Sequence, residues 1–234
     1  MQKKHWELSD IEKRLGVSFR NTALLQEALT HRSYVNEDPS WPVGHNERLE
    51  FLGDAVLELV MTEFLFAQFS EKPEGELTSL RAAMVNTDML SQRAAYIGMN
   101  DVLLLSRGEA KDTGRARQYL LANAFEAIVG AMYLDQGYGT TQEFILRVVT
   151  SRMSEVLDKK LYKDPKSLFQ EEAQERVGVT PTYEVTREWG PDHDKHFVVG
   201  VYLDTELVAE GEGPSKQIAQ EEAARNGLQA KGWV

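Results

Sequence analysis

The sequence predicts an all-α N-terminal domain followed by a small α+β domain with the element order α-β-β-β-α. Up to about Tyr162, apolar residues recur at the spacing of amphipathic helices, and strand-like alternation is essentially missing. After Lys163-Asp164-Pro165 the pattern changes to a helix, three alternating runs and a closing helix. We therefore place one domain over residues 1–160 and a second over residues 164–234.

The N-terminal domain is predicted to be a series of helices joined by short loops. A proline- and glycine-bearing loop is expected at residues 36–45, directly before the longest helix. That helix should end at residues 70–75, where Ser-Glu-Lys-Pro-Glu-Gly interrupts the apolar spacing. The helical segments that the spacing predicts are 10–15, 21–29, 46–69, 76–98, 117–135 and 141–157.

The C-terminal domain begins with a clear helix start. Asp164 suits an N-cap and Pro165 the first helical position, so a helix should run to about Val177. A closing helix should begin near Pro214-Ser215 and run to about Lys231. The strands predicted between these helices are 182–188, 196–203 and 206–211, joined by turns at 190–193 and 204–205.

Composition excludes several classes of protein. Cysteine is absent, so disulfides and thiolate metal sites are ruled out. The most apolar stretch, residues 52–66, is interrupted by Asp54, Glu58 and Glu63, and no membrane-spanning segment is expected. The N-terminal residues lack the apolar run and cleavage site of a secretory signal. We expect a cytoplasmic protein with no membrane partner.

The charge of the chain is strongly acidic. The net charge is −11, and the part after Lys163 holds 7 basic and 14 acidic residues, a net charge of −7. Contacts to nucleic-acid phosphates normally come from Lys and Arg, so the overall charge alone argues against a nucleic-acid-binding protein. A role of that kind must depend on where the few basic residues lie.

Three carboxylates share one face of the longest predicted helix. Glu47, Glu50 and Asp54 are spaced i, i+3 and i+7, which places them on the same side over two turns. Like charges at this spacing repel each other unless cations bridge them. Taken alone, the pattern also fits a solvated acidic face on an ordinary helix.

A glycine interrupts the same helix. Gly53 lies in mid-helix, where glycine is about 1 kcal/mol less favourable than alanine. The position therefore indicates that another part of the protein approaches the backbone closely there.

The stretch that holds these residues, Asn-Glu-Arg-Leu-Glu-Phe-Leu-Gly-Asp-Ala-Val-Leu at 46–57, resembles the signature helix of the ribonuclease III family. Residues 120–135, which include Asn123 and Glu126, resemble the second catalytic helix of that family. Residues 30–34, 73–75 and 113–115 also match family segments in the same order. The resemblance covers nearly the whole chain, and its C-terminal part is similar to a double-stranded RNA-binding domain.

The resemblance implies a homodimeric, Mg²⁺-dependent endonuclease that cuts double-stranded RNA, leaving 5′-phosphates and short 3′ overhangs, with precursor ribosomal RNA as main substrate. Mn²⁺ would be a substitute ion, and no small-molecule cofactor is expected. Mg²⁺ held by hard oxygen ligands can activate water and stabilise phosphoryl charge. The residues that the resemblance assigns to the metal are Glu50, Asp54, Asn123 and Glu126. Asp54 and Glu126 would be catalytic. Glu47 and Glu74 would support the same cleft, helping across a dimer interface and in holding RNA.

Asn123 departs from the family pattern, which has aspartate at this position. Its neutral carbonyl oxygen can ligate Mg²⁺, but the site loses one negative charge, so metal affinity should fall. We favour a tolerated variant of an active enzyme, because Glu47, Glu50, Asp54, Glu74 and Glu126 are all present. The alternative is a catalytically weakened or inactive relative that only binds double-stranded RNA.

The C-terminal domain would contact A-form RNA, whose wide minor groove displays 2′-hydroxyls. The residues that the resemblance assigns to RNA contact are Lys166, Gln170 and Glu171 on the first helix, His193 in the loop after the first strand, and Ser215 and Lys216 at the start of the last helix. Backbone N–H groups at that last helix start would favour phosphate. With few cations nearby, binding by this domain alone should be weak and salt-sensitive.

Overall fold

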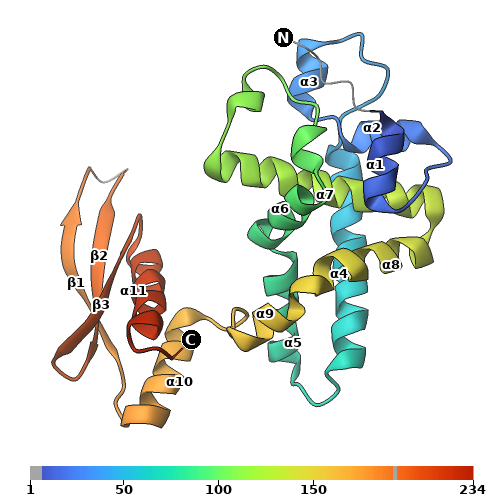
Figure 1. The fold of residues 1–234 in the computed structure, drawn as a ribbon. Helices are drawn as coiled ribbons and strands as arrows, with labels where there is room; N and C mark the ends of the chain where they lie inside the picture. Colours follow the sequence, from blue (N-terminus) through green and yellow to red (C-terminus); the bar gives the residue numbers. More distant parts are fainter. Residues whose placement is uncertain (1–6, 192–193, 234) are drawn as a thin grey trace. The chain divides into compact units, whose positions relative to one another are not determined.

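The computed structural model describes residues 7–191 and 194–233 (Figure 1). The chain divides between Val156 and Leu157 into an N-terminal helical unit and a C-terminal unit with a three-stranded sheet. The two units are described separately below. None of the described helices combines the length and the apolar character that a membrane span requires.

The N-terminal unit is built from helices, as predicted. Its α-helices are α1 Leu8–Leu15, α2 Thr22–Ala28, α3 Arg32–Glu37, α4 Glu47–Gln68, α5 Glu74–Val85, α6 Thr87–Tyr96, α7 Gly114–Gln136, α8 Tyr138–Val149 and α9 Met153–Asp158. Short 3-10 turns lie at Met99–Asp101, Glu109–Lys111 and Thr150–Arg152.

The largest differences from the prediction concern three segments. The helix expected over 76–98 is two helices, because Asn86 is extended and its side chain accepts a hydrogen bond from the Met89 N–H (2.9 Å), which caps α6. The helix expected over 141–157 is α8 and α9 with a 3-10 turn between them. The loop expected to begin at residue 36 begins after α3, which ends at Glu37.

The core of this unit forms where α4 and α7 cross, which Figure 1 shows near the middle of the unit. Leu57 and Met61 of α4 are fully buried, as are Phe125 and Ile128 of α7. Phe125 also stacks on Phe144 of α8, with ring centroids 5.9 Å apart. The crossing is therefore held by an apolar core, and it fixes which residues of the two helices lie side by side.

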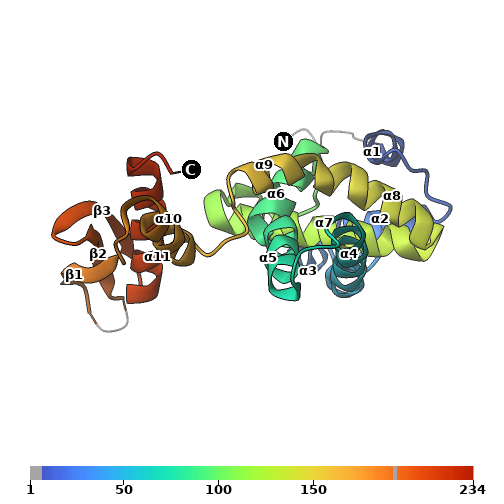
Figure 2. The same ribbon diagram turned by 90° about the horizontal axis from the view of Figure 1, so that it is seen from below.

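The C-terminal unit has the predicted α-β-β-β-α order. Its elements are α10 Pro165–Val177, β1 Thr182–Trp189, β2 His196–Leu203, β3 Glu206–Gly213 and α11 Lys216–Ala230. The strands form an antiparallel sheet in the order β1-β2-β3, with a register shift between Val185 and Arg187. Both helices lie on the same face of the sheet, as Figures 1 and 2 show. Phe169, Val201 and Leu228 are central to the core between them.

Candidate functional site

The acidic face begins at the first turn of α4. Glu47 and Glu50 lie in that turn, where the positive end of the helix dipole favours carboxylates. Asp54 follows one turn later and is exposed, while Glu50 is half-buried. The helix thus brings the three predicted carboxylates to one side, as their spacing indicated.

Two glycines allow α4 and α7 to touch through their backbones. A Cβ added to Gly53 would lie 1.8 Å from the carbonyl oxygen of Glu126 and 2.9 Å from the amide nitrogen of Gly130. A Cβ added to Gly130 would lie 2.2 Å from the carbonyl oxygen of Leu49. The prediction of a close backbone approach at Gly53 is confirmed, and the approaching segment is the one that carries Glu126.

This crossing brings Glu50, Asp54, Asn123 and Glu126 into electrostatic contact. Burial, followed by the charges of Asp54 and Glu50, raises the pKa of Glu126 to about 8. Burial and then the charge of Glu47 also raise the pKa of Glu50, whereas a hydrogen bond donated by the Asn123 amide lowers it. A carboxyl with a pKa of about 8 holds its proton at neutral pH when no cation is near. The cluster is therefore a place where negative charge is in excess.

No protein cation relieves this excess within residues 7–191 and 194–233. Glu50, Asp54 and Glu126 make no ion pair there, although other carboxylates of α4 and α5 do. Together with Asn123 they offer only hard oxygen donors, the set that Mg²⁺ prefers. In the same residues, no three acidic or histidine side chains form a finished metal site as they stand. The oxygen donors and the excess negative charge nevertheless fit a divalent cation, which would offset the repulsion between the carboxylates.

Glu47 has different neighbours from the other carboxylates. Its side chain lies 3.7 Å from the Arg32 guanidinium and 3.7 Å from Nδ1 of His45. His31 is also near, and burial, as the largest effect, lowers the pKa of this imidazole. Glu47 therefore borders the cluster and links it to a basic group. The sequence did not single out His45, although it stands only two residues before Glu47.

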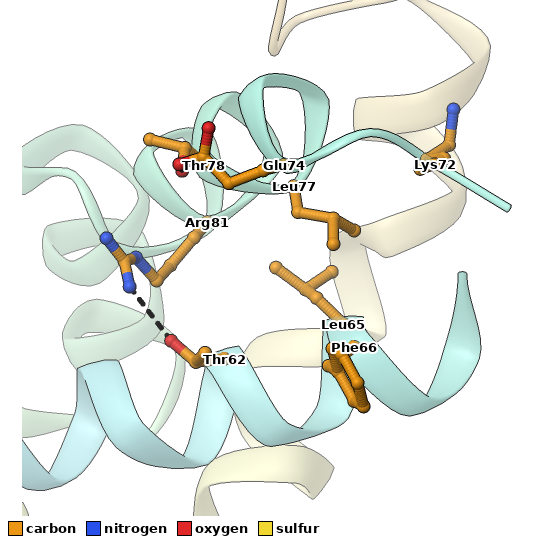
Figure 3. A pocket seen from close by; sticks show the side chains of 8 residues that line it. All are labelled: Thr62, Leu65, Phe66, Lys72, Glu74, Leu77, Thr78 and Arg81. Carbon is orange, nitrogen blue, oxygen red and sulfur yellow. Dashed lines mark hydrogen bonds between the residues drawn. The ribbon is translucent and has the colours of Figure 1, made fainter. Parts of the chain in front are cut away.

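Glu74 does not join the cluster within one chain. It lies at the start of α5 and accepts a hydrogen bond from the Thr78 hydroxyl (3.0 Å), beside a hollow of about 440 Å³ between α4 and α5 (Figure 3). The hollow is lined by Thr62, Leu65, Phe66, Lys72, Glu74, Leu77, Thr78 and Arg81. Thr62 lies eight residues beyond Asp54, roughly 12 Å along the helix axis. Within one chain, Glu74 is therefore two helical turns or more from Asp54, and the expectation that it helps from across a dimer interface stays a prediction.

The predicted RNA-contact residues of α10 lie near one another. Gln170 and Glu171 are exposed, and Glu171 forms an ion pair with Lys163 (2.5 Å). Lys166 donates a hydrogen bond to Gln220 of α11 (2.6 Å) and lies 5.1 Å from the Tyr183 ring centroid. The Lys166 ammonium thus ties the two helices together, which the sequence did not indicate, because Gln220 carries no recognisable signal of its own.

At the start of α11, Ser215 is the N-cap, and its hydroxyl oxygen accepts a hydrogen bond from the Ile218 N–H (3.2 Å). Lys216 is exposed, with its ammonium 5.7 Å from the Phe197 ring centroid. Gly190, before the β1–β2 turn, has φ +92°, and a Cβ there would lie 2.2 Å from the Asp194 carbonyl oxygen. Glycine is therefore required at this turn. His193, the loop residue expected to contact RNA, lies outside the described residues.

Comparison with known families matches both parts of the chain. Residues 21–153 match the family described as Ribonuclease-III-like, and residues 165–231 match the Double-stranded RNA binding motif. The first match covers more than half of the chain and includes the whole acidic cluster.

Individual relatives agree with the family matches. The chain is 43% identical over 222 residues to the Ribonuclease 3 of a Nitratiruptor species, covering 95% of this chain and 96% of the relative. It is 40% identical over 225 residues to the Ribonuclease 3 of Enterococcus faecalis, covering 95% and 96%. A solved structure describes the nuclease domain of ribonuclease III from Campylobacter jejuni and the flexibility of the region involved in its dimer formation. It is 36% identical to this chain with a TM-score of 0.57, and the match covers 63% of this chain and 99% of that chain. The chain therefore belongs to the ribonuclease III family and is an endoribonuclease with a double-stranded RNA binding motif behind its helical nuclease domain.

Proposed function

We propose that this protein hydrolyses double-stranded RNA in a Mg²⁺-dependent reaction that leaves 5′-phosphates and short 3′ overhangs. The observation that carries the proposal is the convergence of carboxylates from α4 and α7 without a protein cation among the described residues. The expected main substrate is precursor ribosomal RNA, followed by other structured transcripts. Mapping the RNA ends that change when the protein is depleted would test the substrates.

Glu50, Asp54, Asn123 and Glu126 would hold the metal, with Mn²⁺ as a possible replacement for Mg²⁺. A bound Mg²⁺ supplies an activated water and stabilises charge on phosphoryl oxygens. Asp54 is exposed and can reach an RNA backbone, whereas Glu126 is half-buried and held in place by the contact between α7 and Gly53. Asp54 and Glu126 are accordingly assigned the catalytic roles. Glu47, paired with Arg32 and His45, borders the RNA path.

Replacing Glu126 by glutamine tests this assignment. Glu126→Gln keeps the size of the side chain but removes its charge, and cleavage of a labelled duplex should fall roughly a hundredfold or more. Duplex binding, measured without divalent ions, should stay within about twofold, because phosphate contacts dominate affinity. Glu143→Gln on α8 removes a charge at an exposed position and should change neither quantity. Equal loss of binding and cleavage in Glu126→Gln would contradict the assigned role.

Asn123 bears on the alternative of a protein that binds duplexes without cutting them. An aspartate here would add a fourth carboxylate and remove the amide donor to Glu50. Asn123→Asp should therefore lower the Mg²⁺ concentration needed for half-maximal cleavage, because the site gains a negative ligand. If neither form cuts across a wide Mg²⁺ series while both bind the duplex, the binding protein is the correct interpretation.

We further propose that two copies associate through α4, as the homodimeric family pattern implies. Phe51, Leu59 and Phe66 lie on one side of this helix and are 82%, 51% and 75% exposed. Apolar side chains exposed along one face are typical of a protein interface. In Figure 3, Phe66 lies across the hollow from Glu74, so a second copy on this face would come close to Glu74.

Sedimentation of the full chain tests this association. The wild type should sediment as a dimer, and Phe66→Ser should shift the equilibrium towards the monomer because it removes apolar surface at the interface. Tyr96→Ser is the matched control, since Tyr96 is exposed on α6 rather than on α4. A monomeric wild type at micromolar concentration would contradict the proposed dimer.

A further inference from the structure

The segment just before α10 is folded onto the C-terminal unit. The Lys160 N–H donates to the Leu157 carbonyl (3.1 Å), and the Lys163 N–H donates to the Lys160 carbonyl (3.0 Å). Asp164 then caps α10 by accepting a hydrogen bond from the Ser167 N–H (2.9 Å). These contacts give residues 157–163 a defined path, so their side chains have defined neighbours on α10.

Two lysines of this segment form ion pairs with adjacent glutamates of α10, in different surroundings. Lys160 binds Glu172 (2.5 Å), whose side chain is 5% exposed and also binds Arg176 (2.7 Å). Lys163 binds Glu171 (2.5 Å), whose side chain is 57% exposed. In the first pair the carboxylate is buried and the pair holds the segment in place, whereas in the second pair the carboxylate is exposed and follows Gln170 on α10.

The position of the second pair matters because of the charge around it. The part of the chain after Lys163 has a net charge of −7, and an unpaired carboxylate on its RNA face would be repelled by phosphates. The Lys163 ammonium is bound to Oε2 of Glu171, which neutralises the carboxylate and restricts its rotamers. Oε1 is left to accept a hydrogen bond, and a 2′-hydroxyl of RNA is a donor of the right kind.

We propose that Lys163 is a positioning residue for double-stranded RNA binding, which acts by orienting and neutralising Glu171 rather than by contacting phosphate itself. The inference rests on the proposed function and on the contact between Glu171 and RNA that the family resemblance implies. It adds a residue that lies before the matched RNA-binding motif, which begins at residue 165.

A double-mutant cycle on the full chain tests this role. The probe is a fluorescent RNA duplex of about 20 base pairs, which is long enough for one RNA-binding domain. Its binding is measured in EDTA for the wild type, Lys163→Met, Glu171→Ala and the double variant. Lys163→Met should weaken binding about three- to tenfold in the wild type and less than about 1.5-fold in the Glu171→Ala background. Lys163→Arg, which keeps the charge and the donor, should restore most of the affinity.

Two further measurements separate this role from others. The dependence of affinity on salt should keep its slope in Lys163→Met, whereas loss of a direct phosphate contact would reduce the slope by about one. The melting temperature should stay within about 2 °C, because the Glu171 carboxylate is exposed and ion pairs of this kind contribute little to stability. Lys159→Met removes the same charge four residues away and should weaken binding less than Lys163→Met does.

The positioning role would be overturned if Lys163→Met weakened duplex binding equally in the wild type and in the Glu171→Ala background, or if it tightened binding. Either result would leave duplex binding itself established. A wild-type protein that fails to bind the duplex would overturn the proposed function, and the inference with it.

Discussion

Gly53 provides the sharpest test of how the site is built. In an isolated helix, Gly53→Ala should stabilise by about 1 kcal/mol, because alanine is the better helix former. In this fold the added Cβ would lie 1.8 Å from the Glu126 carbonyl oxygen and 2.9 Å from the Gly130 amide nitrogen. Both opposing atoms belong to backbone, so no flexible side chain can move aside.

The size of the effect follows from this geometry. Restoring a C···O separation of roughly 3.3 Å requires α4 and α7 to move apart by about 1.5 Å. Overpacking of this kind costs about 3 kcal/mol, and the gain in helix propensity offsets about 1 kcal/mol of it. The net loss of about 2 kcal/mol should lower the melting temperature by about 4–8 °C. Because the shift also separates Asp54 from Glu126, cleavage should fall by about a hundredfold.

Calorimetry and duplex cleavage measure both consequences. Gly139→Ala is the control, since this glycine lies in α8 and a Cβ there meets nothing within 4 Å. The control should melt at the same temperature or slightly higher and should cut normally. If Gly53→Ala also melted higher and retained full cleavage, the close crossing of α4 and α7 would be refuted as the basis of the site.

Two further predictions concern stability. Asp135 accepts hydrogen bonds from the backbone N–H groups of Arg20 and Asn21 (2.8 Å each). Burial alone would raise the pKa of its carboxyl, but these hydrogen bonds, a further one from Gln136 and the charge of Arg20 together lower it. The carboxylate of Asp135 therefore stabilises the fold fully above its unfolded pKa near 3.9, and this stabilisation is lost as the pH falls through the lower folded pKa. Asp135→Ala should lower the free energy of unfolding in urea by about 1–3 kcal/mol at pH 7, and by progressively less below about pH 4. Lys160→Met should weaken the protection of α10 against hydrogen exchange by about 1–2 kcal/mol, because buried Glu172 loses one of its two cations. Unchanged protection would contradict the structural role of the Lys160–Glu172 pair.

The sequence by itself determined most of the elements and much of the site's composition. Apolar spacing and the Asp164-Pro165 helix start predicted α10, and alternation predicted the three strands within one or two residues. The spacing of Glu50 and Asp54 placed them on one face, and the unfavourable Gly53 indicated a close neighbour. These features could be predicted because they depend on periodicity and capping, which are local properties of the chain.

Only the tertiary structure decided which of these groups meet. The high pKa of Glu126 arises because the crossing of α4 and α7 buries it beside Asp54, an arrangement that neither helix contains alone. Two other residues illustrate the same point. Glu74 lies apart from the carboxylates of α4 and α7, and Lys163 forms an ion pair with Glu171. Contacts between distant segments depend on how complete elements pack, and the spacing of residues along one element does not specify that packing.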